Sequence, residues 1–239
     1  MKISVISRII IREKKAEILG RLTYSQNFED VKGAFLVVEA VPEKIEIKKD
    51  TFKKVDELAD AETIIVSNTS GLSISEIASV TNRQDKVMGA HFFYPAPVMK
   101  LLELVRGLVT SDETYDVVKE FAGKIGKTTV DAPEFPGFMV NRILVPMQNE
   151  AAFMVMEGSK PEDVDNAMKL GCNHPMGPIE LTDFVGIDTM LATMTGLYNG
   201  FHDSKYRPCP LLETMVKSGM LGKKTGQGFY KYDEKGNKI

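Results

Sequence analysis

Residues 64–106 read IIVSNTSGLSISEIASVTNRQDKVMGAHFFYPAPVMKLLELVR, and this stretch decides the fold. It holds three apolar runs that we expect to be strands, at residues 64–66, 86–90 and 101–105. β-Branched runs of this kind are typical of strands buried on both faces of a parallel sheet. Between the first two runs, Ser73 and Glu76 have the spacing of a capping box, which predicts a short helix. The pattern therefore predicts an open α/β sheet.

Polar residues stand where these strands end. Asn68 and Ser70 follow the first strand, and His91 follows the second. In open α/β sheets the carboxyl ends of the strands border the ligand crevice. Glu103 is the lone charge in the third strand, and a carboxylate buried without a partner is costly. An imidazole twelve residues earlier is the obvious partner, because such a pair fixes the histidine tautomer and builds a general base.

A structural interpretation of the same two residues stays open. His91 could simply end a strand while Glu103 lies on a solvated sheet edge, since paired or perturbed groups often have only structural roles. The spacing alone does not decide between these interpretations.

The composition is that of a folded chain that has no special affinity for nucleic acid. The 239 residues are 43% hydrophobic and 26% charged, with a net charge of −3.

Cys172 and Cys209 are too few and too far apart for a disulfide framework or a clustered metal site, and we expect reduced thiols. The three histidines have no metal-ligand spacing, so no metal is expected. No apolar run predicts a membrane span or, at residues 1–15, a signal peptide, so the expected location is the cytoplasm.

Two glycine-rich phosphate motifs are absent. None of the 19 glycines starts a GxGxxG pattern, and a Walker loop fails because Phe121 stands where its first glycine belongs. The nearest approach to GxGxxG is Gly226-Gln227-Gly228, which has Lys231 at the third glycine position.

The rest of the chain divides in two. Before residue 131 we expect strands at 21–25, 34–40 and 127–130, with helices at 45–58 and 111–125. Residues 131–137 carry two prolines and a glycine and lose all periodicity, which marks a boundary. Beyond it the pattern is helical, with helices expected at 138–156, after a Ser159 capping box, at 178–197 and at 210–217. The domains are therefore predicted at 1–135 and 136–239.

Several long blocks together resemble the short-chain 3-hydroxyacyl-CoA dehydrogenases, most closely the bacterial 3-hydroxybutyryl-CoA dehydrogenases of butyrate and fatty acid metabolism. The resemblance covers the chain from about Arg21 onward. The blocks are SNTSGLSISEIA (67–78), GAHFFYPAPVMKLLELVRG (89–107), PGFMVNRIL (136–144), EGSKPEDVDNAMKLGCNHPMGPIELTDFVGIDT (157–189) and KYRPCPLLETMVKSGMLGKKTGQGFY (205–230).

The resemblance implies reversible hydride transfer between NAD or NADP and the C3 hydroxyl of a short-chain acyl-CoA. His91 would be the general base and Glu103 would orient it, while Ser70 and Asn141 would hold the substrate oxygens. Residues 136–239 would bind substrate and form a homodimer. The cofactor would lie near a set of residues on the strand ends: Ala40, Glu43, Lys48, Asn68, Ser70 and Tyr94.

Two features depart from the resembled family. That family opens with a GxGxxG unit that holds the pyrophosphate on a helix N-terminus, so we expect an N-terminally truncated Rossmann-type sheet that lacks the adenosine-binding unit and binds its cofactor less tightly. Tyr94 also replaces the family's usual asparagine near the nicotinamide. An alternative is therefore a non-catalytic remnant that serves as a dimerisation or acyl-CoA-binding module.

Overall fold

Five short strands form one mixed sheet at the centre of the N-terminal half of the molecule. The computed structural model describes residues 14–239. The strand order is β1-β2-β3-β4-β5, and all neighbours are parallel except the antiparallel pair β3 and β4. Their bounds are β1 Leu36–Glu39, β2 Ile64–Ser67, β3 Val87–Phe92, β4 Leu101–Arg106 and β5 Thr128–Ala132.

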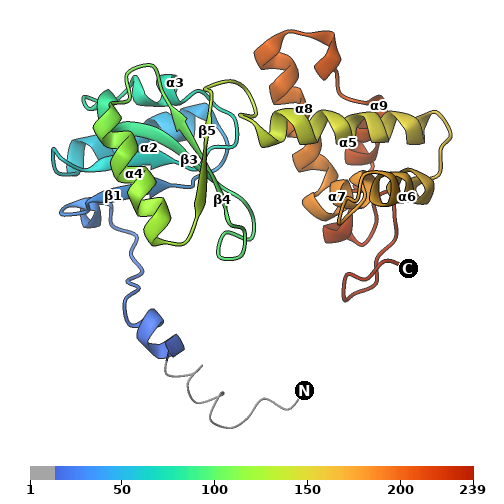
Figure 1. Ribbon diagram of the computed structural model, residues 1–239, viewed down its shortest axis with the longest axis horizontal. Coiled ribbons are helices and arrows are strands. Elements are labelled where there is room, and N and C mark those ends of the chain that lie inside the picture. Colours follow the sequence, from blue (N-terminus) through green and yellow to red (C-terminus); the bar gives the residue numbers. More distant parts are fainter. Residues whose placement is uncertain (1–13) are drawn as a thin grey trace.

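Helices cover both faces of this sheet (Figure 1). Alternate residues of a strand point to opposite faces, so Ile65 packs against α2 (Ile45–Leu58) and α3 (Ile74–Ala78) on one side. Ile64 and Val66 pack against α4 (Asp112–Lys124) on the other. Short 3-10 turns precede β1 and β3, at Phe28–Val31 and Gln84–Lys86. The predicted Rossmann-type arrangement is confirmed in this part of the chain.

The C-terminal half is helical, as predicted. It contains α5 Val140–Met156, α6 Pro161–Gly171, α7 Pro178–Val185, α8 Ile187–Phe201 and α9 Pro210–Lys217, with 3-10 turns at Ser204–Tyr206 and Lys223–Thr225. Its core comes mainly from α5, α8 and α9, which contribute Ala152, Met194 and Leu212 among other buried residues. The linker between β5 and α5 joins the two halves (Figure 1).

Two buried aspartates fix the C-terminal segment of this half. Asp165 of α6 accepts hydrogen bonds from two backbone N–H groups at the start of α7, at 2.8 and 3.0 Å, and from the Tyr230 hydroxyl at 2.7 Å. Asp183 of α7 accepts from the backbone N–H groups of Phe229 and Tyr230. Each carboxylate is thus satisfied by donors rather than by a cation, as a buried charge requires.

Three local predictions were wrong. Residues 21–25 form no strand, because β1 pairs with β2 alone among the described strands and residues 21–25 are exposed. The helix predicted at 178–197 is two helices, separated by Gly186, whose φ of +104° lies outside helical geometry. The cap of α6 is Lys160, not Ser159, because Pro161 starts the helix with its fixed φ.

Within residues 14–239, no helix combines the length and the apolar character needed to cross a membrane.

Candidate active site

His91 and Glu103 lie directly opposite each other on neighbouring strands. The antiparallel register of β3 and β4 pairs them as cross-strand partners. His91 Nδ1 stands 2.7 Å from Glu103 Oε2, and the two residues are 5% and 0% exposed. The hydrogen-bonded pair expected from spacing therefore exists, and the carboxylate that could not be buried alone has its partner.

Glu103 also holds the first turn of α5. Its other oxygen, Oε1, accepts hydrogen bonds from the backbone N–H groups of Met139 at 3.1 Å and Val140 at 2.9 Å. The helix has no side-chain cap of its own, so a carboxylate from the sheet satisfies donors that every helix start leaves unpaired. Because Asn141 follows Val140 directly, one carboxylate positions both the imidazole and the helix that carries Asn141.

These contacts fix the tautomer of His91. Glu103 accepts two backbone hydrogen bonds and is an acceptor toward the imidazole as well, so Nδ1 carries the hydrogen. Nε2 then carries the lone pair and has no hydrogen-bond partner among residues 14–239. The rings of Phe93 and Phe138 flank the imidazole, with ring centroids 4.5 and 5.8 Å away. The geometry is that of an oriented proton acceptor flanked by two aromatic rings.

Ser70 sits in the turn after β2, and Glu43 braces that turn. Glu43 Oε1 accepts from the Ser70 backbone N–H at 2.8 Å and from the Thr69 hydroxyl. The Ser70 hydroxyl makes no hydrogen bond within residues 14–239, which leaves it free for a ligand. Asn141 Nδ2 lies 3.4 Å from the Ser70 carbonyl oxygen, a long contact that nonetheless places Asn141 beside this turn.

A buried ion pair behind this turn escaped the sequence analysis. Lys48 is 1% exposed, and its Nζ lies 2.9 Å from Glu39 Oε1 and 3.2 Å from Glu43 Oε2. Glu39 also accepts from the Ser67 hydroxyl at 2.6 Å. Lys48 is therefore linked to the Ser70 turn through Glu43. The sequence could have indicated this ion pair, because Glu39 is the lone charge in an apolar strand, as Glu103 is in β4.

The remaining predicted site residues lie just after the carboxyl ends of β1, β2 and β3. Asn68 Oδ1 accepts a hydrogen bond from the Phe92 backbone N–H at 2.8 Å, which ties the ends of β2 and β3 together. Ala40 is exposed directly after β1. Tyr94 is 84% exposed in the loop after β3.

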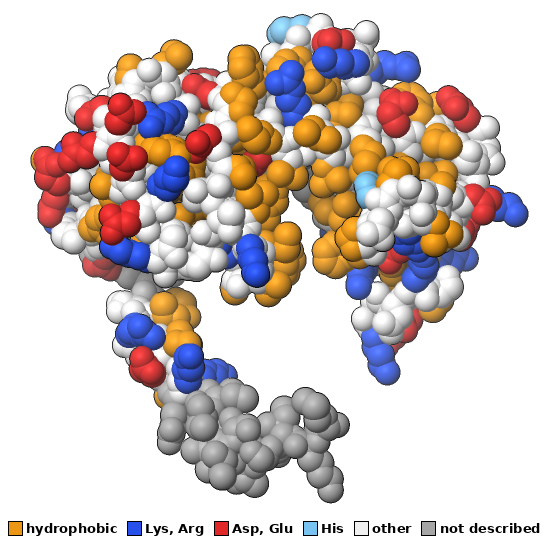
Figure 2. All heavy atoms as spheres, in the orientation of Figure 1, with side chains coloured by type: hydrophobic (Ala, Val, Ile, Leu, Met, Phe, Trp, Pro, Cys, Tyr) orange, Lys and Arg blue, Asp and Glu red, His pale blue; other side chains and the backbone are white. Residues whose placement is uncertain are grey.

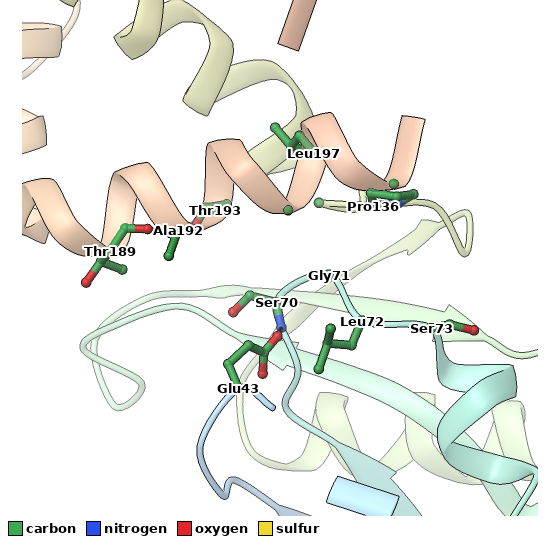
Figure 3. Close-up of a pocket in the computed structure, with 13 residues that line it drawn as sticks. Glu43, Ser70, Gly71, Leu72, Ser73, Pro136, Thr189, Ala192, Thr193 and Leu197 are labelled. Atoms are coloured by element: carbon green, nitrogen blue, oxygen red, sulfur yellow. Dashed lines mark hydrogen bonds between the residues drawn. The ribbon is translucent and has the colours of Figure 1, made fainter. Parts of the chain in front are cut away.

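A cleft of about 540 Å³ separates the two halves of the molecule. Figure 3 shows Ser70, Leu72 and Glu43 facing Thr189, Ala192 and Thr193 of α8 across it. In Figure 2 the molecule is hollowed between its halves, with hydrophobic side chains along the walls. His91 and Asn141 do not line the cleft itself. Its thirteen lining residues are Glu43, Ser70, Gly71, Leu72, Ser73, Pro136, Gly137, Thr189, Ala192, Thr193, Gly196, Leu197 and Gly200.

Comparison with known proteins gives a consistent assignment. Residues 2–135 match the family model of the 3-hydroxyacyl-CoA dehydrogenase NAD binding domain, and residues 137–232 match that of the 3-hydroxyacyl-CoA dehydrogenase C-terminal domain. The chain is 53% identical over 219 residues to a probable 3-hydroxybutyryl-CoA dehydrogenase of Bacillus subtilis, covering 91% of this chain and 76% of the relative. It is 51% identical over 225 residues to the 3-hydroxybutyryl-CoA dehydrogenase of Clostridioides difficile, covering 94% and 80%.

A solved structure agrees with this assignment. The crystal structure of (S)-3-hydroxybutyryl-CoA dehydrogenase from Ralstonia eutropha superposes with a TM-score of 0.90 at 46% identity, covering 96% of this chain and 83% of that one. Together with the family matches, which span nearly the whole sequence, this places the chain in the 3-hydroxyacyl-CoA dehydrogenase family of NAD-binding oxidoreductases.

Proposed function

We propose that this protein interconverts a short-chain 3-hydroxyacyl-CoA and its 3-keto form, with His91 as the general base. The observation that carries the proposal is the buried His91–Glu103 pair, whose free Nε2 is an oriented proton acceptor. The family matches and the names of the bacterial relatives support the substrate class.

The described residues fit the nicotinamide end of a cofactor. The carboxylate of Glu43 is about half exposed at the edge of the cleft, and the Ser70 hydroxyl has no partner within residues 14–239. We propose NAD or NADP in this place, flanked by the strand ends that carry Ala40, Asn68 and, on its loop, Tyr94. The 239 residues contain no GxGxxG turn, so we propose that the adenosine-binding unit is not among them.

The cofactor, when bound, supplies the acceptor for the hydride that leaves C3. His91 Nε2 takes the proton of the C3 hydroxyl, and Glu103 holds the imidazole in place and faces the positive charge that forms. Ser70 and Asn141 donate hydrogen bonds to the substrate oxygens where negative charge develops in the transition state. In the reverse direction the imidazolium returns its proton to the oxygen of the reduced 3-keto group.

We also propose the organisation around this chemistry. The domain boundary lies between residues 135 and 136, supported by the change from sheet to helices in the linker. A homodimer forms through the helical domain, because several large apolar side chains there are exposed, among them Ile143, Met154, Met156 and Leu170. The expected location is the cytoplasm, in keeping with the reduced cysteines proposed from the sequence.

The test is oxidation of NADH, and in parallel of NADPH, by the purified 239-residue chain with acetoacetyl-CoA. We expect turnover that His91→Ala reduces by at least about 100-fold, the usual range for a lost general acid–base residue, since His91 donates the proton in this direction. His174→Ala is the matched control, because this half-buried histidine makes no side-chain hydrogen bond within residues 14–239. A folded chain without turnover, or a His91→Ala variant as active as the control, would contradict the proposal.

A further inference from the structure

The linker between the two halves carries a carboxylate with an unusual set of partners. Glu134 Oε1 accepts hydrogen bonds from the Ser73 hydroxyl at 2.8 Å and from the Ser75 backbone N–H at 2.5 Å. Its Oε2 accepts from the Ser75 hydroxyl at 2.6 Å. Within residues 14–239 no lysine or arginine lies within ion-pair distance of Glu134. Three donors from one short segment therefore hold this charge.

That segment is the continuation of the turn that carries Ser70. Ser73 is the N-cap of α3, and its hydroxyl accepts from the Glu76 backbone N–H, while Glu134 accepts the Ser75 backbone N–H of the same first turn. The Ser75 hydroxyl donates to Glu134 and accepts from the Leu108 backbone N–H at 2.7 Å. One hydroxyl thus ties together the linker, the start of α3 and the loop after β4.

The linker and the Ser70 turn pass each other at backbone distance. A Cβ atom added to Gly71 would lie 2.8 Å from the Gly137 nitrogen. On its other side the linker packs closely against α8. A Cβ atom added to Gly200 of that helix would lie 2.4 Å from Pro136 Cγ. Residues 136 and 137 are therefore a wedge between Ser70 and α8, the two walls of the cleft (Figure 3).

We propose that Glu134 is a positioning residue that fixes this wedge against the Ser70 turn and thereby sets the spacing of the two cleft walls. Glu134 lies two residues before Pro136, so its hydrogen bonds to Ser73 and Ser75 hold the linker where it enters the wedge. The proposal rests on the proposed function for its kinetic consequence: a shifted α8 or Ser70 changes how the substrate is aligned for hydride transfer. It does not place Glu134 in contact with substrate or cofactor.

The kinetic test uses Glu134→Gln, in which one carboxylate oxygen becomes an N–H₂ group that cannot accept from the Ser75 hydroxyl. We expect kcat with acetoacetyl-CoA to fall about 10- to 100-fold, since small misplacements carry costs of this size. The isotope effect with NADH deuterated at the transferred position should rise, because hydride transfer becomes slower than product release. The pH profile should stay unchanged, because the His91–Glu103 pair is untouched.

Ser75→Ala removes the same contact from the other side, and the double variant should be no slower than the slower single variant. Glu120→Gln is the matched control, because Glu120 is exposed on α4 and its ion pair is with Lys124 one turn away. Wild-type kcat and isotope effect in Glu134→Gln would overturn the proposal. Should Glu134→Gln fail to fold, Ser75→Ala decides by the same measurements.

A distance measurement separates this proposal from the proposed function. Spin labels on the exposed native Cys172 and on a Lys124→Cys substitution report the spacing of the two halves, since Cys209 is buried. Excess unlabelled protein dilutes the labelled chains, so that the measured distances come from two labels on one chain. We expect a narrow distance distribution that Glu134→Gln broadens. If the wild-type chain has no turnover, the proposed function fails and this distribution alone decides the role of Glu134, with an unchanged width as the contrary result.

Discussion

Replacing Glu103 with glutamine tests the site most directly, because the carboxylate accepts from three donors with two oxygens. The donors are His91 Nδ1 on one side and the backbone N–H groups of Met139 and Val140 on the other. Glutamine keeps one acceptor oxygen and turns the other position into an N–H₂ donor. The N–H₂ group must therefore face either the two backbone N–H groups or His91 Nδ1.

We expect the amide oxygen to stay on the helix side, where it keeps two hydrogen bonds instead of one. The N–H₂ group then faces His91, whose Nδ1 must become the acceptor, so the hydrogen moves to Nε2. An imidazole in this tautomer has no lone pair for the substrate hydroxyl. Losing the correct tautomer in a serine protease triad costs about 10⁴-fold in kcat, so we expect a loss of about 10²- to 10⁴-fold, or about 3–5 kcal/mol.

The assay is steady-state NADH formation from 3-hydroxybutyryl-CoA across a range of pH, the direction in which His91 accepts the hydroxyl proton, beside guanidinium denaturation of the same samples. The expected result is a large fall in kcat at every pH with a small change in the denaturation midpoint. Glu120→Gln, on the surface of α4, is the control for the charge change. A Glu103→Gln variant with kcat within about threefold of the wild type would refute the tautomer argument. Loss of the pair would then change the activation free energy by less than about 1 kcal/mol.

Three further substitutions test separate parts of the structure. Ser70→Ala should lower kcat/KM by about 100-fold without changing the unfolding free energy, because its hydroxyl has no partner within residues 14–239; unchanged kinetics would remove Ser70 from the site. Lys48→Met should lower the unfolding free energy, measured by urea denaturation, by about 3–5 kcal/mol, because it leaves Glu39 without its cation. The control is Lys49→Met, in the more exposed ion pair of the same helix, which should lower it by under about 1 kcal/mol. Asp165→Ala should cost about 3 kcal/mol by stranding three donors, and a loss below about 1 kcal/mol would argue against that network.

Much of the fold followed from local patterns. The helices predicted at 45–58 and 210–217 have those bounds in the structure, and Ser73 caps α3 as its spacing with Glu76 predicted. These features depend on periodicity and on side chains that contact their own backbone, which the sequence displays directly. The antiparallel direction of β4 did not follow, because strand direction depends on the path of residues 93–100 and not on the composition of the strand itself.

The site was predicted in part, for a related reason. A lone glutamate in an apolar strand led to the His91–Glu103 pair, and the same rule applied to Glu39 would have found its buried bonds to Lys48 and Ser67. The role of Glu134 could not be found in this way. Its partners are two serine hydroxyls and a backbone N–H about sixty residues away, and none of these has a periodic signature.

Two glutamates within strands organise the site because neither could be buried without distant donors. Glu39 at the end of β1 collects Lys48 from α2 and Ser67 from β2, and Lys48 in turn holds Glu43 against the Ser70 turn. Glu103 in β4 collects the histidine from β3 and the start of α5. A buried carboxylate costs several kcal/mol unless its acceptors are filled, so the fold that satisfies both charges must also bring Ser70, His91 and the helix bearing Asn141 to one rim. The arrangement proposed for catalysis is therefore enforced by the sheet, and a change that leaves either carboxylate unsatisfied should disturb the fold and the site together.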